Sequence, residues 1–506
     1  MANKKIAIIG GGIAGLCAGV YAQRSGYDAE IFEMGAEPGG LATSWRRGDY
    51  TFETCIHWLL GSNPHGVFHA QWQEVFDIDR LKFIDQDEYI RLETDRGERV
   101  SLYSDVDRME SELLRVAPQD EKEIRHLAAS VRRLGSLPLP DANGPWTTSL
   151  LSMMRTVPFM PLLREWSGMS CDQYSRRYSH PLLRSLFARE DELAALAFVF
   201  SLAWMSRRNA GYPIGGSRAV IQAIADRFQS LGGRLRVNAE VDRIRVENGA
   251  ATALELANGD TIPADWVISA ADGHSTIYDL LGGMYRDGKI DRIYRTLKTF
   301  PSYVQVSFGI ARDLSGSAPF VIRVLDAPLE LDPVTRCDRA AFRLFHYDPT
   351  FAPQGKTAVT CFLPTRNFAF WADLRQNDFQ RYTAEKQRIA GQVMNILERS
   401  VLGVRDALEE TDVATPATVI RCTGNWKGSM EGWLITPGMG FRTLPQTLPG
   451  LRGFAMAGQW VLPGGGLPSG LMTARSAMQL ICKEDHAEFL PPHPVLRSVA
   501  TTGSRT

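Results

Sequence analysis

The chain has 506 residues, of which 44% are hydrophobic and 22% charged, a balance that supports large buried cores without disulfide or metal staples. Its 56 basic and 57 acidic residues leave a formal net charge of −1 without a basic stripe, so nucleic-acid binding is excluded. No apolar stretch is as long as the about 18 residues that a membrane-spanning helix requires. The seven cysteines are scattered along the chain, and none forms a CxxC motif. We therefore expect reduced thiols and a cytoplasmic location, with peripheral membrane contact and the oligomeric state left open.

The first forty residues carry a dinucleotide-binding pattern. Residues 6–9 form a short apolar run typical of a buried parallel strand, and Gly10-Gly11-Gly12-Ile13-Ala14-Gly15 follows at once. Gly10 permits a tight turn, Gly12 lets a pyrophosphate approach the backbone, and Gly15 lets the next helix pack closely against the sheet. A second strand at residues 29–32 ends at Glu33, whose carboxylate is placed to accept hydrogen bonds from ribose hydroxyls.

The segment Gly39-Gly40-Leu41-Ala42-Thr43 favours FAD over NAD as the dinucleotide. It resembles the GG-x-x-x-T/S element that lines FAD in two-dinucleotide-binding flavoproteins, whereas an NAD dehydrogenase would continue with another βαβ unit. The alternative interpretation is an ordinary glycine turn.

The middle of the chain changes character twice. Residues 81–205 look mainly helical, and a glycine-rich turn at residues 211–217 then opens a helix with Ser217 as the expected N-cap. Two alternating strands within residues 241–256 flank Asn248-Gly249, a two-residue hairpin signal. Residues 266–270 form another buried strand, so an α/β module returns after a helical insertion, which predicts a discontinuous domain.

A second glycine-rich loop lies near the C-terminal end. Residues 453–458 predict a strand that ends in Gly458, the loop 463–470 contains Gly464-Gly465-Gly466-Leu467, and an apolar helical pattern follows. A strand, loop and helix in this order present free N–H groups to an electron-rich ligand. A purely structural loop is the alternative.

These three segments, in this order, resemble the phytoene desaturase, carotenoid isomerase and retinol saturase superfamily of FAD-dependent oxidoreductases. The resemblance implies an α/β fold, α+β overall, with a discontinuous Rossmann-type two-dinucleotide-binding FAD domain and an inserted substrate domain of mixed sheet and helices. We expect FAD-domain segments at residues 1–80, 208–285 and 426–486, the helical and sheet parts of the substrate domain at 81–207 and 286–425, and a disordered tail at 487–506.

By the same resemblance, bound FAD would contact residues from all three FAD-domain segments. These are Gly10, Gly12, Ala14, Gly15, Glu33, Gly40, Leu41, Thr43, Val241, Gly458, Gly466 and Leu467. Val241 would lie near the adenine, and the last three residues near the ribityl chain and the flavin ring. No metal site is expected, because the sequence has no HExxH or paired CxxC pattern.

Catalysis by this family needs a flavin and a group that moves a proton. His57 and Arg207 are the candidate catalytic residues, because His57 follows the Gly39–Thr43 element and Arg207 directly precedes the central FAD segment. Tyr212, His346 and Trp426 are weaker candidates. An ordinary structural role is the competing interpretation for each residue, since only geometry can place an acid or base. The apolar segments 150–169 and 193–205 would either line a substrate tunnel or pack into the core.

Three functional hypotheses follow. The first is a desaturase, isomerase or saturase that transfers hydride between flavin N5 and a lipophilic isoprenoid or polyene. The second is a flavin-dependent cyclase or tailoring oxidoreductase of a polyene secondary metabolite that uses NAD(P)H, because the loop with Trp426 and Trp433 resembles such members. The third is a non-catalytic prenyl-group carrier of the GDP-dissociation-inhibitor type, which fold analogy alone supports.

Overall fold

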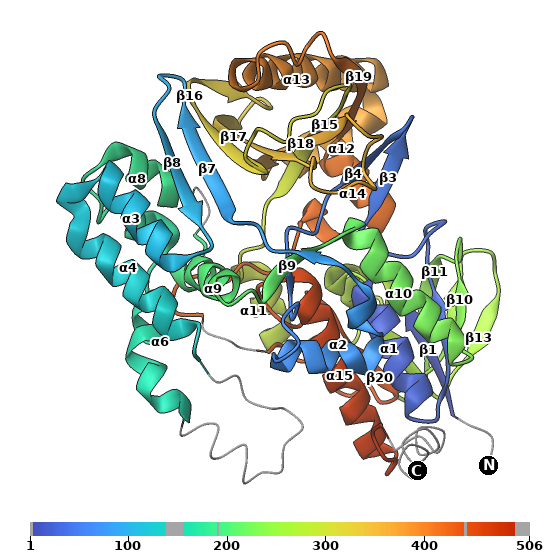
Figure 1. Cartoon of the computed structure of the whole chain (residues 1–506). Coiled ribbons are helices and arrows are strands. Elements are labelled where there is room, and N and C mark those ends of the chain that lie inside the picture. Colours follow the sequence, from blue (N-terminus) through green and yellow to red (C-terminus); the bar gives the residue numbers. More distant parts are fainter. Residues whose placement is uncertain (1–3, 138–154, 190–191, 440–442, 491–506) are drawn as a thin grey trace, which may run out of the picture.

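A parallel five-stranded sheet, built from three distant parts of the chain, forms the lower half of the molecule (Figure 1). The computed structural model describes residues 4–137, 155–189, 192–439 and 443–490. In spatial order the strands are β10 (Arg234–Arg236), β2 (Asp28–Phe32), β1 (Lys5–Ile9), β14 (Trp266–Ser269) and β20 (Phe454–Met456). The strands expected at the start, middle and end of the sequence therefore pair with one another.

Both faces of this sheet are buried, which explains why its central strands β1 and β14 are apolar at nearly every position. Ile6 and Ile8 pack against three helices, α1 (Ile13–Arg24), α10 (Gly216–Ser230) and α15 (Gly466–Glu484). Ala7 and Ile9 pack on the opposite face, against the small sheet of β11 (Val241–Glu247), β12 (Ala250–Leu256) and β13 (Thr261–Pro263). The alternation of side chains along one strand thus builds two separate cores.

The predicted hairpin between β11 and β12 is confirmed. Its two turn residues, Asn248 and Gly249, have φ of 52° and 72°, the left-handed pair that a two-residue turn between antiparallel strands requires.

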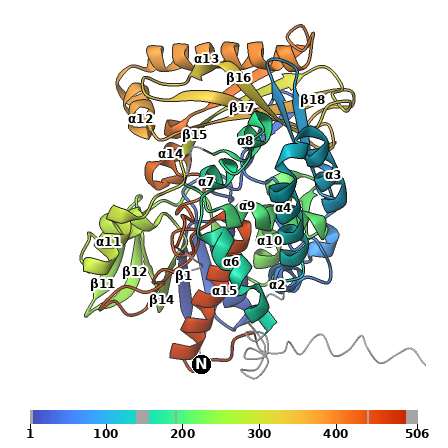
Figure 2. The ribbon, with the colours of Figure 1, turned by 90° about the vertical axis from the view of Figure 1, so that its left-hand side faces the viewer.

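A second sheet, with seven strands in the described part of the chain, lies at the top of the molecule in Figures 1 and 2 and is called the roof sheet below. In spatial order its strands are β19 (Leu408–Ala414), β15 (Ser302–Ile310), β18 (Thr357–Thr365), β17 (Arg336–Leu344), β16 (Phe320–Glu330), β7 (Glu88–Thr94) and β8 (Arg99–Tyr103). Helix α13 (Phe379–Ser400) lies over its outer face. Val304 and Val306 of β15 join the core beneath α13, so the alternate residues Tyr303 and Gln305 face the lower half of the molecule.

The expectation that residues 81–205 are mainly helical missed three strands, β6 (Phe83–Ile84), β7 and β8. Within β7, Ile90 and Leu92 alternate with Arg91 and Glu93, which is a strand period. Gly97 has a φ of +81° in the turn that joins β7 to β8. Strand β7 pairs with β16, which lies far away in the sequence, so the local pattern does not reveal this pairing. The residues of β7 are therefore predicted to be helical like the longer segment around them.

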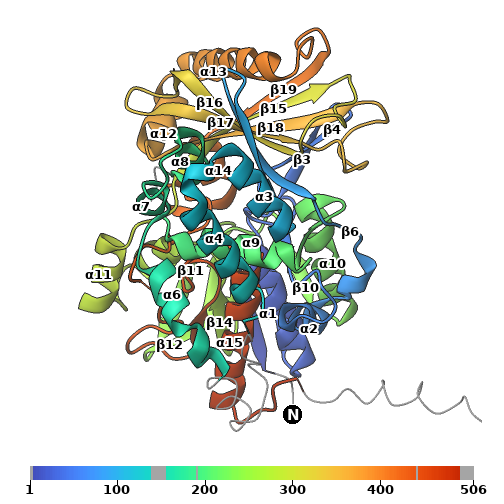
Figure 3. The same ribbon diagram turned by 60° about the vertical axis from the view of Figure 1, so that its left-hand side comes forward.

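The remaining described part of this insertion is helical and lies below the roof sheet, alongside the lower half of the molecule (Figure 3). Its helices are α3 (Val106–Val116), α4 (Glu121–Leu134), α6 (Met160–Ser167), α7 (Cys171–Ser175), α8 (Pro181–Phe187) and α9 (Ala195–Ser206). Trp166 and most apolar side chains of α9 are buried in one core with β7 and β8. Core packing is therefore confirmed for these residues, but not for Met160, which is exposed, or for Met205, which lies outside this core. Met153 and Met154 lie outside the described residues.

Helix α10 does not begin with Ser217 as its N-cap. Gly215 holds that position with a φ of +91°, and Ser217 lies inside the first turn. The buried carboxylate of Glu53, at the end of β4 (Tyr50–Glu53), replaces the expected cap: it accepts hydrogen bonds from the Ser217 N–H at 2.8 Å and the Ser217 hydroxyl at 2.7 Å. It also accepts bonds from the N–H groups of Cys55 and Ile56.

The first residues of the expected disordered tail are packed. The Phe489 ring lies 5.6 Å from that of Tyr21 on α1, and the Leu490 N–H donates to the Ser25 hydroxyl. Residues 491–506 lie outside the described residues. Among the helices that the structure describes, none combines the length and apolar character needed to cross a bilayer.

We expect Glu53→Ala to lower the free energy of unfolding by about 3 kcal/mol, because it leaves two buried N–H groups and one partly buried N–H group without their acceptor. Thermal unfolding monitored by circular dichroism measures this loss. Glu37→Ala is the matched control, since Glu37 pairs with Arg218 at the surface and such pairs contribute about 0–1 kcal/mol. Equal midpoints for the two variants would contradict the role given to Glu53.

Candidate functional site: a dinucleotide edge and an adjoining pocket

The carboxyl ends of four parallel strands meet at one edge of the lower sheet. Gly10 follows β1, Glu33 follows β2, Ala270 follows β14 and Gly458 lies two residues beyond β20. In open α/β sheets this edge is where nucleotide cofactors bind. The sheet therefore brings residues from all three predicted FAD segments to one place.

The Gly10–Gly15 loop is built for close approach. Gly10 has a φ of +93°, and a Cβ atom on Gly15 would lie 1.9 Å from the Gly10 carbonyl oxygen. Helix α1 can therefore start directly against the strand only with glycine at residue 15. No side chain among the described residues caps this helix, so its first N–H groups, around Gly12 and Ala14, are available to an anion.

The Gly39–Thr43 segment runs beside that loop. The Gly39 N–H donates to the Gly11 carbonyl at 3.0 Å, and Gly40 has a φ of +60°. The carbonyls of Leu41 and Thr43 each accept a bond from the Thr54 hydroxyl at 3.1 Å.

Glu33 closes the other side of the same edge. Its carboxylate accepts the N–H groups of Gly11 and Gly35, each at 2.7 Å. The Ala239 N–H donates to the Glu33 carbonyl at 2.8 Å, which sets the start of β11, and with it Val241, beside the acid. Val241 therefore lies on the edge where the adenine was expected.

The C-terminal glycine loop supplies a second helix N-terminus. Gly464, Gly465 and Gly466 have φ of 102°, 60° and 75°, and the buried Leu467 follows in α15. A Cβ on Gly470 would lie 2.6 Å from Ile13 Cγ2, so the first turn of α15 packs directly against that of α1.

Two observations test whether this edge fits a dinucleotide. Helices α1 and α15 both begin here without a side-chain cap among the described residues, which suits an anionic phosphate group. The Ser44 hydroxyl, directly after Thr43, is buried and has no hydrogen-bond partner within the described part of the chain, and such a group normally has one. The residues present therefore fit a dinucleotide.

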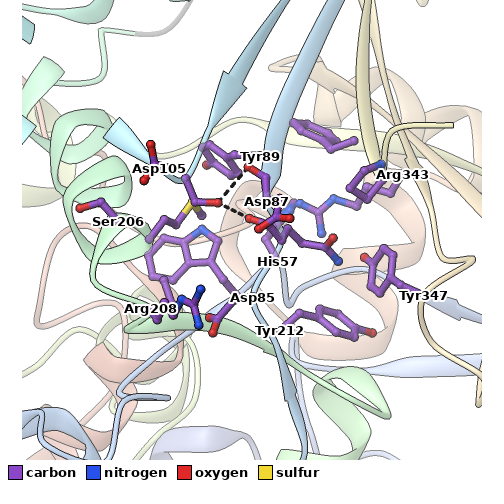
Figure 4. A pocket seen from close by; sticks show the side chains of 17 residues that line it. His57, Asp85, Asp87, Tyr89, Asp105, Ser206, Arg208, Tyr212, Arg343 and Tyr347 are labelled. Carbon is purple, nitrogen blue, oxygen red and sulfur yellow. Dashed lines mark hydrogen bonds between the residues drawn. The ribbon is translucent and has the colours of Figure 1, made fainter. Parts of the chain in front are cut away.

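A pocket of about 140 Å³ lies between the roof sheet and the lower half of the molecule (Figure 4). His57 and Trp58 border it from the segment before β5 (Leu59–Leu60), and Tyr212 from β9 (Ala210–Pro213). The other lining residues that matter here are Tyr89 on β7, Met205 at the end of α9, Phe320 on β16, Arg343 on β17 and Tyr347. Exposed charged residues, Asp85, Asp87, Asp105 and Arg208, form the rim.

Arg343 is the charged residue of the pocket interior. Its side chain reaches toward His57 in Figure 4, and the residue is 8% exposed. One guanidinium N–H donates to the Ile56 carbonyl at 3.2 Å, and the group lies 5.2 Å from the centre of the Phe320 ring. Burial lowers the pKa of Arg343 to about 10, which still leaves it charged at neutral pH.

The predicted acid–base candidates do not all reach this pocket. His57 and Tyr212 line it, whereas Arg207 is exposed and its neighbour Arg208 lines the rim instead. The Tyr212 hydroxyl donates to Asp348 at 3.0 Å, and burial raises the pKa of Tyr212. His346 lies outside the pocket, next to the Ser317 carbonyl.

Trp426 belongs to a separate aromatic cluster. Its ring stacks on His274 at 4.8 Å and meets Trp433 at 6.1 Å, while the backbone N–H of Trp426 donates to the buried carboxylate of Asp272 at 2.8 Å. Sequence reasoning missed Arg343 and Asp272, although the run Ser269–Asp272 at the end of a buried strand could have pointed to Asp272.

Burial raises the pKa of Asp272 from 3.8 to about 6, against the opposing hydrogen bonds from Ser275 and Trp426. Because the folded protein holds this proton more tightly than the unfolded chain, the contribution of Asp272 to the free energy of unfolding is greatest below about pH 4. This contribution falls as the pH rises and is lost above about pH 6.

Accordingly, Asp272→Asn should gain stability relative to the wild type between pH 4 and pH 7, by about 3 kcal/mol for a shift of two pKa units. Thermal unfolding of both proteins across this range measures the change. Asp279→Asn, which removes an exposed carboxyl from the same segment, is the control for the substitution itself. A stability difference between Asp272→Asn and the wild type that does not change between pH 4 and pH 7 would contradict the raised pKa of Asp272.

Comparison with known proteins places the chain among flavoenzymes. The sequence profile of the flavin containing amine oxidoreductases matches residues 13–482. The chain is 23% identical to a neurosporene-forming phytoene desaturase of Rhodobacter capsulatus, over 94% of this chain and 93% of that protein. It is 22% identical to the chloroplastic prolycopene isomerase 1 of an Oncidium hybrid cultivar, over 91% and 80% of the two chains.

A solved oxidoreductase from Methanosarcina mazei shares the fold, with a TM-score of 0.60 and 16% identity over 94% of this chain and 100% of that one. These matches confirm both the family resemblance and the fold class inferred from the sequence.

Proposed function

Because this chain belongs to the flavin containing amine oxidoreductase family, we propose that it is an FAD-dependent oxidoreductase acting on a polyene isoprenoid. One observation carries the cofactor assignment: two uncapped helix N-termini and the Glu33 carboxylate meet at the carboxyl edge of one parallel sheet. The names of its relatives, a phytoene desaturase and a prolycopene isomerase, support the substrate class.

Bound FAD would supply hydride transfer at flavin N5. The residues of the chain would bind and orient it: the N–H groups around Gly12 and Ala14 would hold the pyrophosphate, and Glu33 the ribose. Gly458, Gly466 and Leu467, from the C-terminal segment, would border the ribityl chain and the flavin.

On the substrate side, most residues that line the pocket are polar, and a few offer apolar surface. Trp58, Met205 and Phe320 offer apolar surface, while the His57 imidazole is the proposed site at which a proton is held during turnover. Arg207 is the weaker proposal, because Arg208 rather than Arg207 borders the pocket.

A desaturase oxidises its substrate and a saturase reduces it, whereas an isomerase leaves the oxidation state of its substrate unchanged. External NADH or NADPH is the proposed reductant of the flavin in the saturase and the isomerase. The comparisons do not favour the cyclase and carrier hypotheses. A cytoplasmic location and peripheral membrane contact remain predictions; the exposed side chains of Val157, just before α6, and of Met160, its first residue, support the second.

The purified protein should show oxidised flavin absorbance between 300 and 600 nm, and Glu33→Ala should weaken FAD binding at least tenfold, about 1.4 kcal/mol. Titration of the apoprotein with FAD measures the affinity. Glu37→Ala, which removes an exposed carboxylate from the same region, should bind FAD like the wild type. A colourless protein that does not take up FAD would overturn the proposal.

Anaerobic addition of NADH or NADPH then tests the reductant. Bleaching of the flavin bands supports a saturase or isomerase, whereas bands that persist with a nicotinamide but bleach with a polyene substrate support a desaturase.

A further inference from the structure

Arg343 is a buried guanidinium that no acidic side chain of the described residues pairs with. The structure describes three buried arginines, Arg323, Arg343 and Arg475. Arg323 pairs with Glu93 at 3.3 Å and Asp95 at 3.2 Å, and Arg475 pairs with a carboxylate of α2 (Val67–Val75), that of Glu74, at 2.8 Å. Arg343 differs from these two arginines: its guanidinium contacts the backbone carbonyl of Ile56 and the ring of Phe320, but no carboxylate among the described residues.

The carboxylate that most affects Arg343 from within the fold is Glu53, and its oxygens are already used. They accept the N–H groups of Cys55, Ile56 and Ser217 and the Ser217 hydroxyl. The Glu53 carboxylate therefore binds the N-terminus of α10. The side of the Arg343 guanidinium that lines the pocket has no acidic partner among the described residues.

A buried, unpaired charge costs several kcal/mol. A fold keeps such a group at that cost where a ligand supplies the missing partner, and buried charges without internal partners gather at functional sites. Arg343 meets this condition geometrically, because its guanidinium extends into the pocket beside His57 and Tyr347 (Figure 4).

We propose that Arg343 binds the acidic end of the substrate, a monoanionic group whose charge is shared by two oxygens, of which a carboxylate is the simplest. The planar guanidinium presents paired N–H donors that match such a group. This inference rests on the proposed function and narrows it: the substrate is a polyene acid rather than a hydrocarbon.

The size of the pocket agrees with a single end group. A volume of about 140 Å³ is smaller than the roughly 300–1,000 Å³ that encloses a whole small-molecule ligand. The pocket thus accommodates the acid and its first carbons, and the polyene extends beyond it.

The charge of the rim favours a monoanion over a diphosphate. Asp85, Asp87 and Asp105 border the opening, with Arg208 as the basic residue among them. A diphosphate would bring multiple negative charges past three carboxylates to one interior guanidinium, whereas a carboxylate brings one charge and finds one partner.

The backbone segment that Arg343 contacts lies close in the chain to the dinucleotide edge. The Ile56 carbonyl that Arg343 contacts is three residues from Glu53, and Glu53 pairs across the hairpin with Ser44, which follows the FAD-binding segment. An acid held by Arg343 would therefore fix how far the polyene reaches toward the flavin.

Binding of all-trans-retinoic acid and of its uncharged methyl ester tests the proposal. Quenching of tryptophan fluorescence measures both dissociation constants in the full-length flavoprotein, because Trp58 lines the pocket. We expect the wild type to bind the acid at least tenfold more tightly than the ester. Arg343→Met should reduce this ratio to about one, and Arg343→Lys should keep part of it.

Arg336→Met is the matched control, since Arg336 lies on the same strand but is exposed and pairs with Glu330; it should keep the wild-type ratio. Arg343→Met should also unfold no more than a few degrees below the wild type, because a hydrophobic residue of similar volume commonly replaces a buried charge at little cost. A large fall in stability would assign Arg343 a structural role instead.

Three results would overturn the inference: equal binding of acid and ester by the wild type, a ratio that Arg343→Met leaves unchanged, or tighter binding of geranylgeranyl diphosphate than of the acid. Flavin content is measured separately in each sample. A protein that discriminates acid from ester but holds no FAD would contradict the proposed function and leave the Arg343 anchor standing.

Discussion

The carboxylate of Glu53 ties together the parts of the molecule that form the site. This carboxylate caps α10 and accepts two N–H groups of the segment that leads to His57. The backbone carbonyl of Glu53 accepts a hydrogen bond from the side chain of Gln305 in the roof sheet. A carboxylate buried this deeply is stable only because each oxygen is hydrogen-bonded. Helix α10, the segment before His57 and the roof sheet therefore meet at one residue, Glu53, which also holds Ile56, whose carbonyl Arg343 contacts.

The two halves of the molecule divide the chemistry between them. The lower half offers backbone groups: N–H donors at two helix starts and glycines that allow close approach, which suit a cofactor common to many enzymes. The roof and the helical insertion offer side chains, Arg343, Tyr347 and Phe320 among them, which suit one particular substrate. Recognition of the cofactor is therefore readable in short motifs, whereas recognition of the substrate depends on strands that meet only in the folded chain.

Local signals were reliable where local geometry sets the structure. The glycines at residues 10 and 15, the Asn248-Gly249 turn and the apolar strands at both ends of the chain each have one conformation that fits their sequence. The signals failed where a distant partner decides. Strand β7 has a strand period but lies in a helical context, and Ser217 has the chemistry of an N-cap but yields that role to Glu53, which lies far away in sequence. Arg207 and Arg208 are neighbours in the chain, and only the end of α9 determines which one borders the pocket.

The sequence by itself determined the α/β class, the dinucleotide edge and the family, because the spacing of glycines, an acid and apolar strands follows from backbone geometry within a few residues. The tertiary structure alone decided what surrounds each charged side chain. Arg323 and Arg343 look alike in the sequence, yet one is paired with two carboxylates and the other faces a pocket without an acidic partner among the described residues. The cost of burying a charge depends on the groups around it in space, and those groups come from strands that the sequence keeps far apart.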